Sequence, residues 1–521
     1  MPAPGPESNG HSEPTAETSV YAIYGVEPEV QAYAMAKYSR SALSMKESLR
    51  EISNQKAEKF LNTFYFQYGH RSIADLAHIA FAIEKLSILA AIILVDEQRW
   101  DGQERSTRYQ DFKRSGYYTP DFGADSAARN AYRQTVDFLF SEYEFFSQAM
   151  FEWLHERTPR PEEMKPEAYE RTLRARAFDL SRYLLPLATN TSLGQIVNAR
   201  TLETQISRLQ ASEYAEVRNL GSLLKQAARE PACNANHEPA ERLAAKLREL
   251  NPELADEFSA LSLRPVLAAP TLVKYADPNQ YEMSSRGELR QAARELMSGA
   301  ALETAPLVDL LDDEPLAVEL ATSLLYEYSE YSYRQIRERI EALGAKQRQE
   351  IIDLGLRHRG NHDEMARAFA AGQKFRFDIL MDVGGFRDMH RHRRCIQIGQ
   401  DFTSAHGFDM PEEIETAGLA SRYRAAMNRA QGAVAAAHDS GGDSRMRALY
   451  ALPLAFRKRT LFKMDFAEAV YISELRTTPA GHFSYRNVAY AMYEAVVRRY
   501  PSLAQYFRVT DVREPVDLLK R

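Results

Sequence analysis

A motif that occurs twice constrains this chain more than any other feature. Residues 185–187 read Leu-Pro-Leu, and residues 452–454 repeat them. The first copy is followed after 23 positions by Arg208 and the second after 24 positions by Arg476, and another arginine lies ten positions beyond each. Leu-Pro-Leu alone is a common tripeptide. The preserved order and spacing, however, predict duplication of a whole domain rather than a short repeat period.

Each half also contains an apolar segment that ends in a polar cluster. LSILAAIILVDEQR begins at residue 86, and FRFDILMDVGGFRDMHRHRR begins at residue 375. These two segments and the stretch TLVKYADPN are candidates for strands. Helical periodicity covers most of the remainder, at residues 29–61, 127–156, 239–250 and 334–356. The pattern predicts an α+β fold in which each half has a small sheet and many helices.

The length of 521 residues corresponds to two or three domains. A polar stretch with a proline, residues 276–290, marks a boundary, so we expect the halves at 21–280 and 281–521. Residues 1–20 are rich in Pro, Ser and Glu, lack the apolar centre of a signal peptide, and are expected to be a disordered tail. The longest apolar run, residues 86–95, is half a membrane span and is expected in the core.

Composition limits the classes of function. The net charge of −6 provides no global field for nucleic acid or a membrane surface, so any anion site must be local. The two cysteines, Cys233 and Cys395, lack C-x-x-C spacing, which argues against a disulfide framework and fits a reducing cytoplasm. Their roles stay open, although packing is the simpler role for Cys395. Histidine pairs such as His390 and His392 lack a third ligand, so no metal site is expected.

Two polar stretches are candidates for chemistry. In QERSTRY, Glu104, Ser106 and Arg108 alternate, and residues spaced by two point to one side of an extended segment. An acceptor, a hydroxyl and a guanidinium fork suit a phosphate and its sugar. The second stretch, HRHRR, spans residues 390–394. A solvated charged loop or a surface patch is the alternative for either stretch, and nucleic-acid binding is a weaker one.

These two polar stretches together resemble the signature of a known family. Arg-His-Arg, then seven residues, then Ser within Glu-x-Ser-x-Arg-Tyr is the signature of flavin-dependent thymidylate synthases. The first half keeps residues 104–109 of that signature but has Asp-Glu-Gln at 96–98 in place of Arg-His-Arg. The second half keeps residues 391–393 but has Gly399 and Asp401 where the Glu and Ser belong. Each half has lost what the other retains.

The resemblance implies roles for individual residues. Those expected to contact the flavin are His70, Ser72, Asn198, Arg200, Arg391, His392 and Arg393. Those expected at the nucleotide are Glu104, Ser106, Arg108, Tyr109 and Arg182. The arginines expected to take part in catalysis are Arg208, Arg476 and Arg391.

The family's reaction converts dUMP to dTMP with methylenetetrahydrofolate, FAD and NADPH. The resemblance therefore implies two tandem domains of this family in a pseudo-dimer, with one composite active site made from two incomplete halves. A homodimer would mimic the family's four-subunit assembly, with no nucleic acid or membrane as partner. Two alternatives stay open: a catalytically inactive flavin- or nucleotide-binding relative, and a flavin enzyme that acts on another pyrimidine nucleotide.

Overall fold

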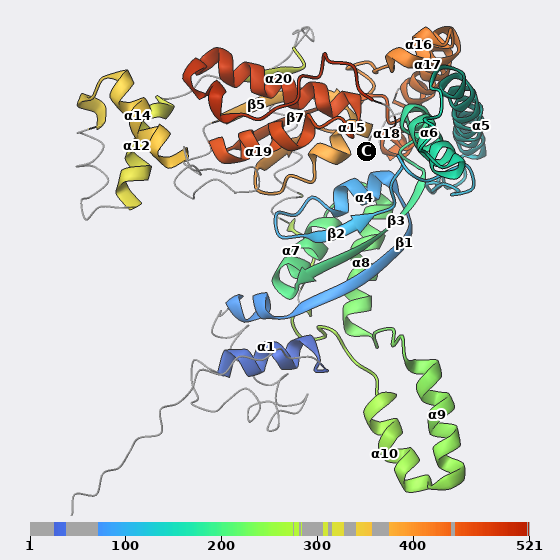
Figure 1. Cartoon of the computed structure of the whole chain (residues 1–521). Helices are drawn as coiled ribbons and strands as arrows, with labels where there is room; N and C mark the ends of the chain where they lie inside the picture. Colours follow the sequence, from blue (N-terminus) through green and yellow to red (C-terminus); the bar gives the residue numbers. More distant parts are fainter. Residues whose placement is uncertain are drawn as a thin grey trace, which may run out of the picture. The chain divides into compact units, whose positions relative to one another are not determined.

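The structure is a computed structural model, which describes residues 25–37, 71–274, 276–280, 283, 306–310, 315–327, 340–356, 375–438, 443–517 and 519 (Figure 1). The expected tail at 1–20 and His70 lie outside these residues. The chain forms two compact units, one from Met1–Ala77 with Ala228–Leu272 and one from His78–Ala227 with Val273–Arg521. The boundary expected near residue 280 stays a prediction.

The smaller unit holds two described helical pairs. Helix α1 (Pro28–Lys37) contacts the 3₁₀ helix η2 (Arg71–Leu76), and α9 (His237–Leu250) packs against α10 (Pro252–Ser262). Glu29 is buried here, and its carboxylate accepts hydrogen bonds from the backbone N–H groups of Thr271 and Leu272, at 2.9 and 2.8 Å.

The larger unit holds two antiparallel sheets. The first has the order β1-β3-β2, and the second β4-β5-β7-β6. The strands of the first are β1 (His78–Ser87), β2 (Asp101–Glu104) and β3 (Asn190–Asn198). Those of the second are β4 (Val308–Leu310), β5 (Phe375–Asp382), β6 (Ile396–Gly399) and β7 (Arg457–Met464). In the first sheet β3 lies between β1 and β2, and in the second β7 lies between β5 and β6.

Helices accompany both sheets in the same chain order. With the first sheet are α4 (Ile88–Leu94), α5 (Ser126–Arg157), α6 (Pro166–Ser181), η3 (Arg182–Leu184), α7 (Ala199–Gln210) and α8 (Ala215–Arg229). With the second are α12 (Leu316–Glu327), α14 (Ala345–Leu356), α15 (Val383–Met389), α16 (Glu412–Thr416), α17 (Ala420–His438), α18 (Asp443–Leu449), α19 (Phe466–Arg476), α20 (Phe483–Arg499) and η5 (Pro501–Tyr506). The repeat is therefore strand, short helix, short strand, helices, strand and two helices. This architecture is α+β, as expected.

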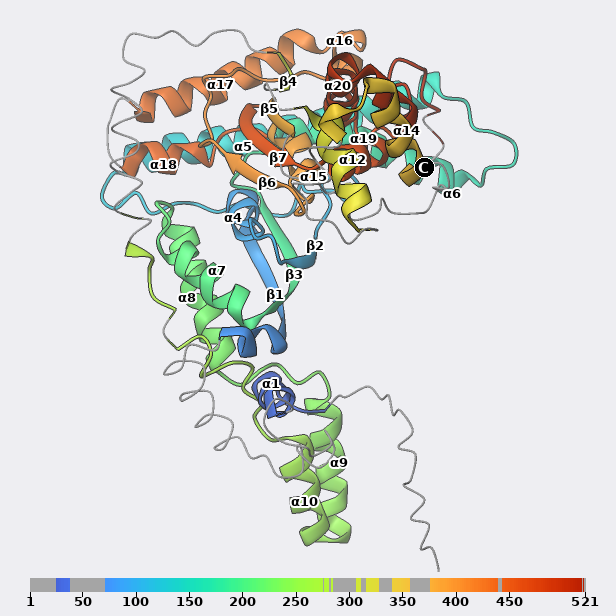
Figure 2. The same cartoon turned by 90° about the vertical axis from the view of Figure 1, so that its left-hand side faces the viewer.

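Two neighbouring pairs of corresponding elements share one offset. Helices α4 and α15 begin at Ile88 and Val383, and strands β2 and β6 begin at Asp101 and Ile396, so both pairs are 295 residues apart. The long helices of the two halves also lie side by side: α17 packs along α5 (Figure 2), where the guanidinium of Arg422 donates two hydrogen bonds to the carboxylate of Glu142. We therefore describe the two halves as repeats that form a pseudo-dimer.

The repeated Leu-Pro-Leu motifs meet each other. Pro186 and Pro453 form an antiparallel bridge. The N–H of Leu187 donates to the carbonyl of Leu452 at 2.9 Å, and the N–H of Leu454 donates to that of Leu185 at 3.0 Å. A proline has no N–H, so each fits the non-hydrogen-bonded position of the pair while its neighbours make the bonds. The four leucines are buried, which places this contact in the core.

The two apolar segments are buried, as expected, but only part of each is a strand. Residues 88–94 and 383–389 are helices instead of strands. Ser87 and Asp382 cap them, since each side chain accepts a hydrogen bond from the backbone N–H three residues on. A capping residue thus ends each strand within the apolar run. Residues 271–274 form a turn rather than a strand.

The helix at 127–156 is confirmed by α5 and that at 239–250 by α9. Of the helices expected at 29–61 and 334–356, the described parts are α1 and residues 340–356, which include α14. Within the described residues, no helix is both long and apolar enough to cross a membrane.

Candidate active site

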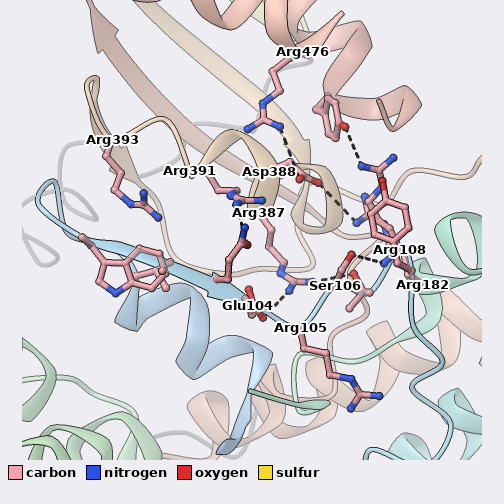
Figure 3. Close-up of a pocket in the computed structure, with 17 residues that line it drawn as sticks. Glu104, Arg105, Ser106, Arg108, Arg182, Arg387, Asp388, Arg391, Arg393 and Arg476 are labelled. Atoms are coloured by element: carbon pink, nitrogen blue, oxygen red, sulfur yellow. Dashed lines mark hydrogen bonds and ion pairs between the residues drawn. The ribbon is translucent and has the colours of Figure 1, made fainter. Parts of the chain in front are cut away.

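A pocket of about 420 Å³ lies between the two repeats of the larger unit (Figure 3). Seven arginines and two carboxylates line it, so its walls are strongly cationic. The lining residues are Val95, Trp100, Gly102, Gln103, Glu104, Arg105, Ser106, Thr107, Arg108, Tyr109, Arg182, Arg387, Asp388, Arg391, Arg393, Arg476 and Tyr485. The loop with Ser106 and the segment beginning at Arg391 thus share one cavity, although 285 positions of sequence (391 minus 106) separate them.

The first wall is strand β2 with the loop that follows it. Gly102 is required here, since a Cβ at this position would lie 2.3 Å from the carbonyl oxygen of Gly194 and 2.6 Å from the Trp100 ring. Arg105 anchors the loop: its guanidinium lies 4.0 Å from the centre of the Phe112 ring and donates to Ser115 Oγ at 2.8 Å. Arg105 is therefore largely occupied by the protein itself.

The second wall begins in helix α15 and reaches across to the first. Arg387 donates to Glu104 Oε1 at 2.6 Å and to Thr107 Oγ1 at 3.1 Å. Arg391, which is exposed, donates to Gln103 Oε1 at 3.1 Å. Glu104 was expected to meet the nucleotide, and in this structure its partner is Arg387 (Figure 3).

Arg108 bridges the repeats. Its guanidinium donates to Asp179 Oδ1 at 3.0 Å, to the Tyr485 hydroxyl at 3.1 Å and to the carbonyl of Ala480 at 3.0 Å. Burial opposes its charge, but Asp179 and the surrounding groups raise the pKa of Arg108 further above its ordinary value. Three of its five N–H donors are in use, so two remain for a ligand. Arg108 thus has a structural role besides any contact with substrate.

Arg182 is the buried cation of the pocket. Only 2% of the residue is exposed. Its Nε lies 3.4 Å from Asp179 Oδ1, and its Nη1 lies 3.9 Å from Asp388 Oδ2. Within the described part of the chain, neither Nε nor Nη2 has a hydrogen-bond partner. Asp179 supplies an ion pair but no hydrogen bond, and buried N–H groups without a hydrogen bond are costly, so this guanidinium is arranged to receive an anion from the pocket.

Asp179 organises these arginines from behind. His482 Nδ1 lies 3.0 Å from its Oδ1, and the other ring nitrogen of His482 is 2.7 Å from the Tyr183 hydroxyl. Burial opposes ionisation, yet His482, Arg182 and Arg108 together hold the pKa of the Asp179 carboxyl well below its usual range. Asp179 is therefore ionised, and it fixes two guanidinium groups of the pocket.

The remaining cations come from the second repeat. The Arg393 guanidinium lies 4.3 Å from the centre of the Trp100 ring. Arg476 Nε donates to His392 Nε2 at 2.7 Å, and its Nη1 is 4.0 Å from Asp388 Oδ1. Burial lowers the pKa of His392, so the imidazole is neutral and can accept this bond. His392 was expected at the flavin, but it holds Arg476 and does not line the pocket.

Arg208 has the corresponding position in the first repeat, but it lies outside the pocket. Its Nε and Nη2 lie 3.0 and 2.9 Å from Glu97 Oε1, and its Nη1 donates to the carbonyl of Ile93 at 3.0 Å. Glu97 corresponds to His392 by the offset of 295 residues. In the second repeat the neutral His392 accepts one hydrogen bond from Arg476 and leaves its charge available. In the first repeat the Glu97 carboxylate forms an ion pair with Arg208.

The other residues expected at the flavin are not brought to this pocket. Asn198 caps α7 by accepting from the N–H of Thr201 at 2.8 Å, and Arg200 lies in the first turn of that helix. Ser72 lies in η2, in the smaller unit. Tyr109, expected at the nucleotide, does line the pocket and is half exposed.

Nine lining residues were not assigned to the site from the sequence, and Trp100, Arg387, Asp388 and Tyr485 are among them. Arg387 lies four positions before Arg391, a spacing that in a continuous helix puts two residues on one side, although α15 ends at Met389. That spacing was the available signal. Asp388, Trp100 and Tyr485 belong to no pattern in the sequence.

The cysteines take no part in the site. Cys233 is exposed, and Cys395 is buried with its thiol donating to the carbonyl of His392 at 2.8 Å. Burial raises the pKa of the Cys395 thiol to about 12. The described residues contain no group of three or more His, Cys, Asp or Glu side chains placed to hold a metal ion.

The family model of the thymidylate synthase complementing protein matches residues 23–231 and again residues 306–502. The two matches together cover most of the chain. The chain belongs to this family. Each repeat is matched separately, which agrees with two tandem domains.

The chain is similar to proteins with two different names. A UPF0159 protein of Chlamydia pneumoniae is 27% identical over 96% of this chain and 93% of its own length, and one of Thermoplasma acidophilum is 25% identical over 92% and 94%. The flavin-dependent thymidylate synthase of Clostridium tetani is 26% identical over 34% of this chain and 68% of its own length. Among solved structures, thymidylate synthase X of Helicobacter pylori with FAD and dUMP is 18% identical, covering 39% of this chain and 89% of that one, with a TM-score of 0.26.

Proposed function

We propose that this member of the family is a flavin-dependent thymidylate synthase that converts dUMP to dTMP at one composite site per chain. The observation that supports this most is the pocket shared by the two repeats. It contains the residues of the Ser106 loop from the first repeat and Arg391 from the second. It also contains Arg182, whose buried Nε and Nη2 make no hydrogen bond in the described structure. Such a site suits a phosphate dianion.

The nucleotide has a consistent orientation in this pocket. Arg182 and the remaining donors of Arg108 would bind its phosphate, because they form the buried end held by Asp179. Ser106 would contact the sugar. Arg476 would then face the pyrimidine and stabilise negative charge that develops on a ring carbonyl, since an arginine stays protonated throughout. His392 and Asp388 keep the Arg476 guanidinium in that position.

The lining also fits an anionic flavin cofactor. Arg391 and Arg393 both reach the pocket, and neither Nε of Arg387 nor Nε of Arg393 has a hydrogen-bond partner in the described part of the molecule. These arginines would hold FAD beside the nucleotide. When bound, the flavin supplies the hydride, while NADPH and methylenetetrahydrofolate are the co-substrates. The chain's own residues bind, orient and neutralise charge.

Two measurements test the proposed function. The purified protein is expected to show the visible absorbance spectrum of a flavin or to acquire it on addition of FAD. With NADPH and methylenetetrahydrofolate present, it is then expected to release tritium from dUMP labelled at C5. Flavin binding without tritium release would favour a catalytically inactive relative. Flavin binding with turnover of another pyrimidine nucleotide would change the assigned substrate.

Replacement of Arg391 is expected to stop turnover without affecting folding. Arg391→Ala removes an exposed guanidinium from the pocket, so we expect kcat/KM to fall roughly a hundredfold or more, with the free energy of unfolding changed by less than about 0.5 kcal/mol. Arg394→Ala is the matched control, since Arg394 pairs with Asp465 at 3.1 Å and does not line the pocket. Full activity in Arg391→Ala would rule out the composite site.

A further inference from the structure

A second, smaller pocket occupies the position that corresponds to the arginine pocket when the repeats are exchanged. Its volume is about 170 Å³. It is lined by Ile92, Ile93, Asp96, Tyr214, Phe386, His390, Gln397, Gly399, Gln400, Asp401, Phe402, Lys458 and Thr460. By the offset of 295 residues, Ile92, Ile93 and Asp96 correspond to Arg387, Asp388 and Arg391. We refer to it below as the mate pocket.

The mate pocket has lost the features that suit a phosphate. Positions equivalent to Ser106 and Thr107 hold Asp401 and Phe402. The position equivalent to Arg182, counted from the Leu-Pro-Leu motif, holds Leu449, which is buried. Two carboxylates now face one ammonium group in the lining, so the net charge no longer attracts a dianion.

Three polar groups nevertheless converge in this pocket. His390 Nε2 and Thr460 Oγ1 are buried and have no hydrogen-bond partner among the described residues. Lys458 is also buried, and its ammonium donates to the carbonyl of Gln400, which leaves further donors available. The Asp96 carboxylate lies 3.9 Å from His390 Nε2 but makes no hydrogen bond with it. Buried polar groups without a hydrogen bond are uncommon in native proteins, so two in one small cavity point to a ligand.

The hydrogen bonds of Gln397 favour one tautomer of His390. Gln397 Nε2 donates to the carbonyl of His392 at 2.9 Å, so its Oε1 faces His390 Nδ1, at 2.8 Å. His390 Nδ1 therefore carries the proton, and Nε2 is an acceptor. Burial lowers the pKa of His390, although Asp96 opposes this, and the ring stays neutral. Burial also lowers the pKa of Lys458 to about 8, so its amine is mostly protonated at neutral pH.

Aromatic rings complete the cavity. The Lys458 ammonium lies 4.6 Å from the centre of the Phe402 ring and 5.7 Å from that of Phe386. Tyr214 also contributes to the lining. A protein cavity of about 150 Å³ accommodates benzene, so a cavity of 170 Å³ fits one six-membered ring.

We propose that the mate pocket binds a small, uncharged, planar amide heterocycle without a phosphate. A ring N–H donates to His390 Nε2, an adjacent carbonyl accepts from Lys458, and Thr460 Oγ1 binds a second polar edge. Phe386 and Phe402 contact the ring. Each chain therefore has two different ligand sites, one for a phosphorylated ligand and one for an uncharged heterocycle. The second site is not needed for the proposed conversion of dUMP to dTMP.

Uracil is the probe for this site, measured by calorimetry and by ligand-detected saturation-transfer NMR on the full chain. We expect uracil to bind to the Arg182→Leu variant as it binds to the wild type, since that change affects only the arginine pocket. Lys458→Met is expected to weaken this binding at least tenfold, because a charge-assisted hydrogen bond is lost. A titration with dUMP is expected to saturate at one equivalent per chain.

Thr460→Val is the second variant, and it separates ligand binding from folding. The change is close to isosteric and removes a hydroxyl that has no partner within the described structure, so thermal stability is expected to stay the same or rise. Uracil affinity is expected to fall about fivefold. The proposal is overturned if uracil fails to bind, or if neither Thr460→Val nor Lys458→Met changes its affinity. Either result leaves the test of dUMP turnover unaffected.

Discussion

Arg182→Leu is expected to weaken dUMP binding about a hundredfold while thermal stability stays unchanged or rises. The Nε and Nη2 atoms of the buried guanidinium make no hydrogen bond in the described structure, and each charge-assisted bond to phosphate contributes roughly 1.5–3 kcal/mol. Without a ligand, the same unpaired groups are a cost of folding. Asp179 keeps Arg108 and His482 as partners at 3.0 Å each, so no isolated buried charge results. Leu449 shows that the fold accepts leucine at the equivalent position.

Calorimetry with dUMP and with deoxyuridine separates the phosphate contact from other effects. Deoxyuridine lacks the phosphate, so it is expected to bind more weakly than dUMP. Its affinity is expected to be the same for Arg182→Leu and for the wild type. Arg174→Leu is the matched control, because Arg174 is half exposed on the same helical segment and pairs with Glu170. Wild-type affinity for dUMP in Arg182→Leu would mean that the phosphate binds elsewhere.

Asp179→Asn is expected to lower the free energy of unfolding by about 3–5 kcal/mol at neutral pH, since removal of one partner leaves buried cations without a counter-charge. Arg108, Arg182 and His482 all face this carboxylate. Urea denaturation measures the loss. Glu170→Gln is the control: its ion pair with Arg174 is more than half exposed and is expected to contribute less than about 0.5 kcal/mol. A loss no larger in Asp179→Asn than in the control would contradict this role.

The pH dependence of that loss follows from the pKa of Asp179. Its pKa is depressed in the folded state, so its contribution is fully present above the unfolded value of about 3.9 and disappears as the pH falls through the folded value. The difference between wild type and Asp179→Asn is therefore expected to be constant from pH 7 to about pH 5 and to shrink below about pH 4. Denaturation curves at several pH values test this directly.

The sequence was most informative where physical requirements are local. The Leu-Pro-Leu repeats and the periodicity of residues 127–156 predicted the duplication and the helix α5, because spacing and helical periodicity depend on neighbouring residues. The complementary halves of one signature predicted that the Ser106 loop and Arg391 share a cavity. The strand assignment of residues 88–94 was wrong, because Ser87 caps a helix within an apolar run that also suits a strand.

The sequence could not show which arginines are available to a ligand. Arg208 and Arg476 lie near the ends of equivalent helices. Arg208 pairs with Glu97, whereas Arg476 donates a hydrogen bond to His392 and lines the pocket. Arg105 and Arg182 are both lining arginines, but Arg105 is bound by its own loop and Arg182 retains unpaired donors. The sequence gives the position of an arginine but not the acceptors around its guanidinium. Only the distances to those acceptors distinguish these cases.

By itself, then, the sequence determined the family, the tandem α+β repeats and the two segments that meet. The tertiary structure decided that equivalent positions of the two repeats line unequal pockets, one with seven arginines and the other with aromatic rings around Lys458. The reason is physical. Repetition is encoded along the chain, whereas the charge of a cavity is the sum over side chains that folding brings together from distant positions.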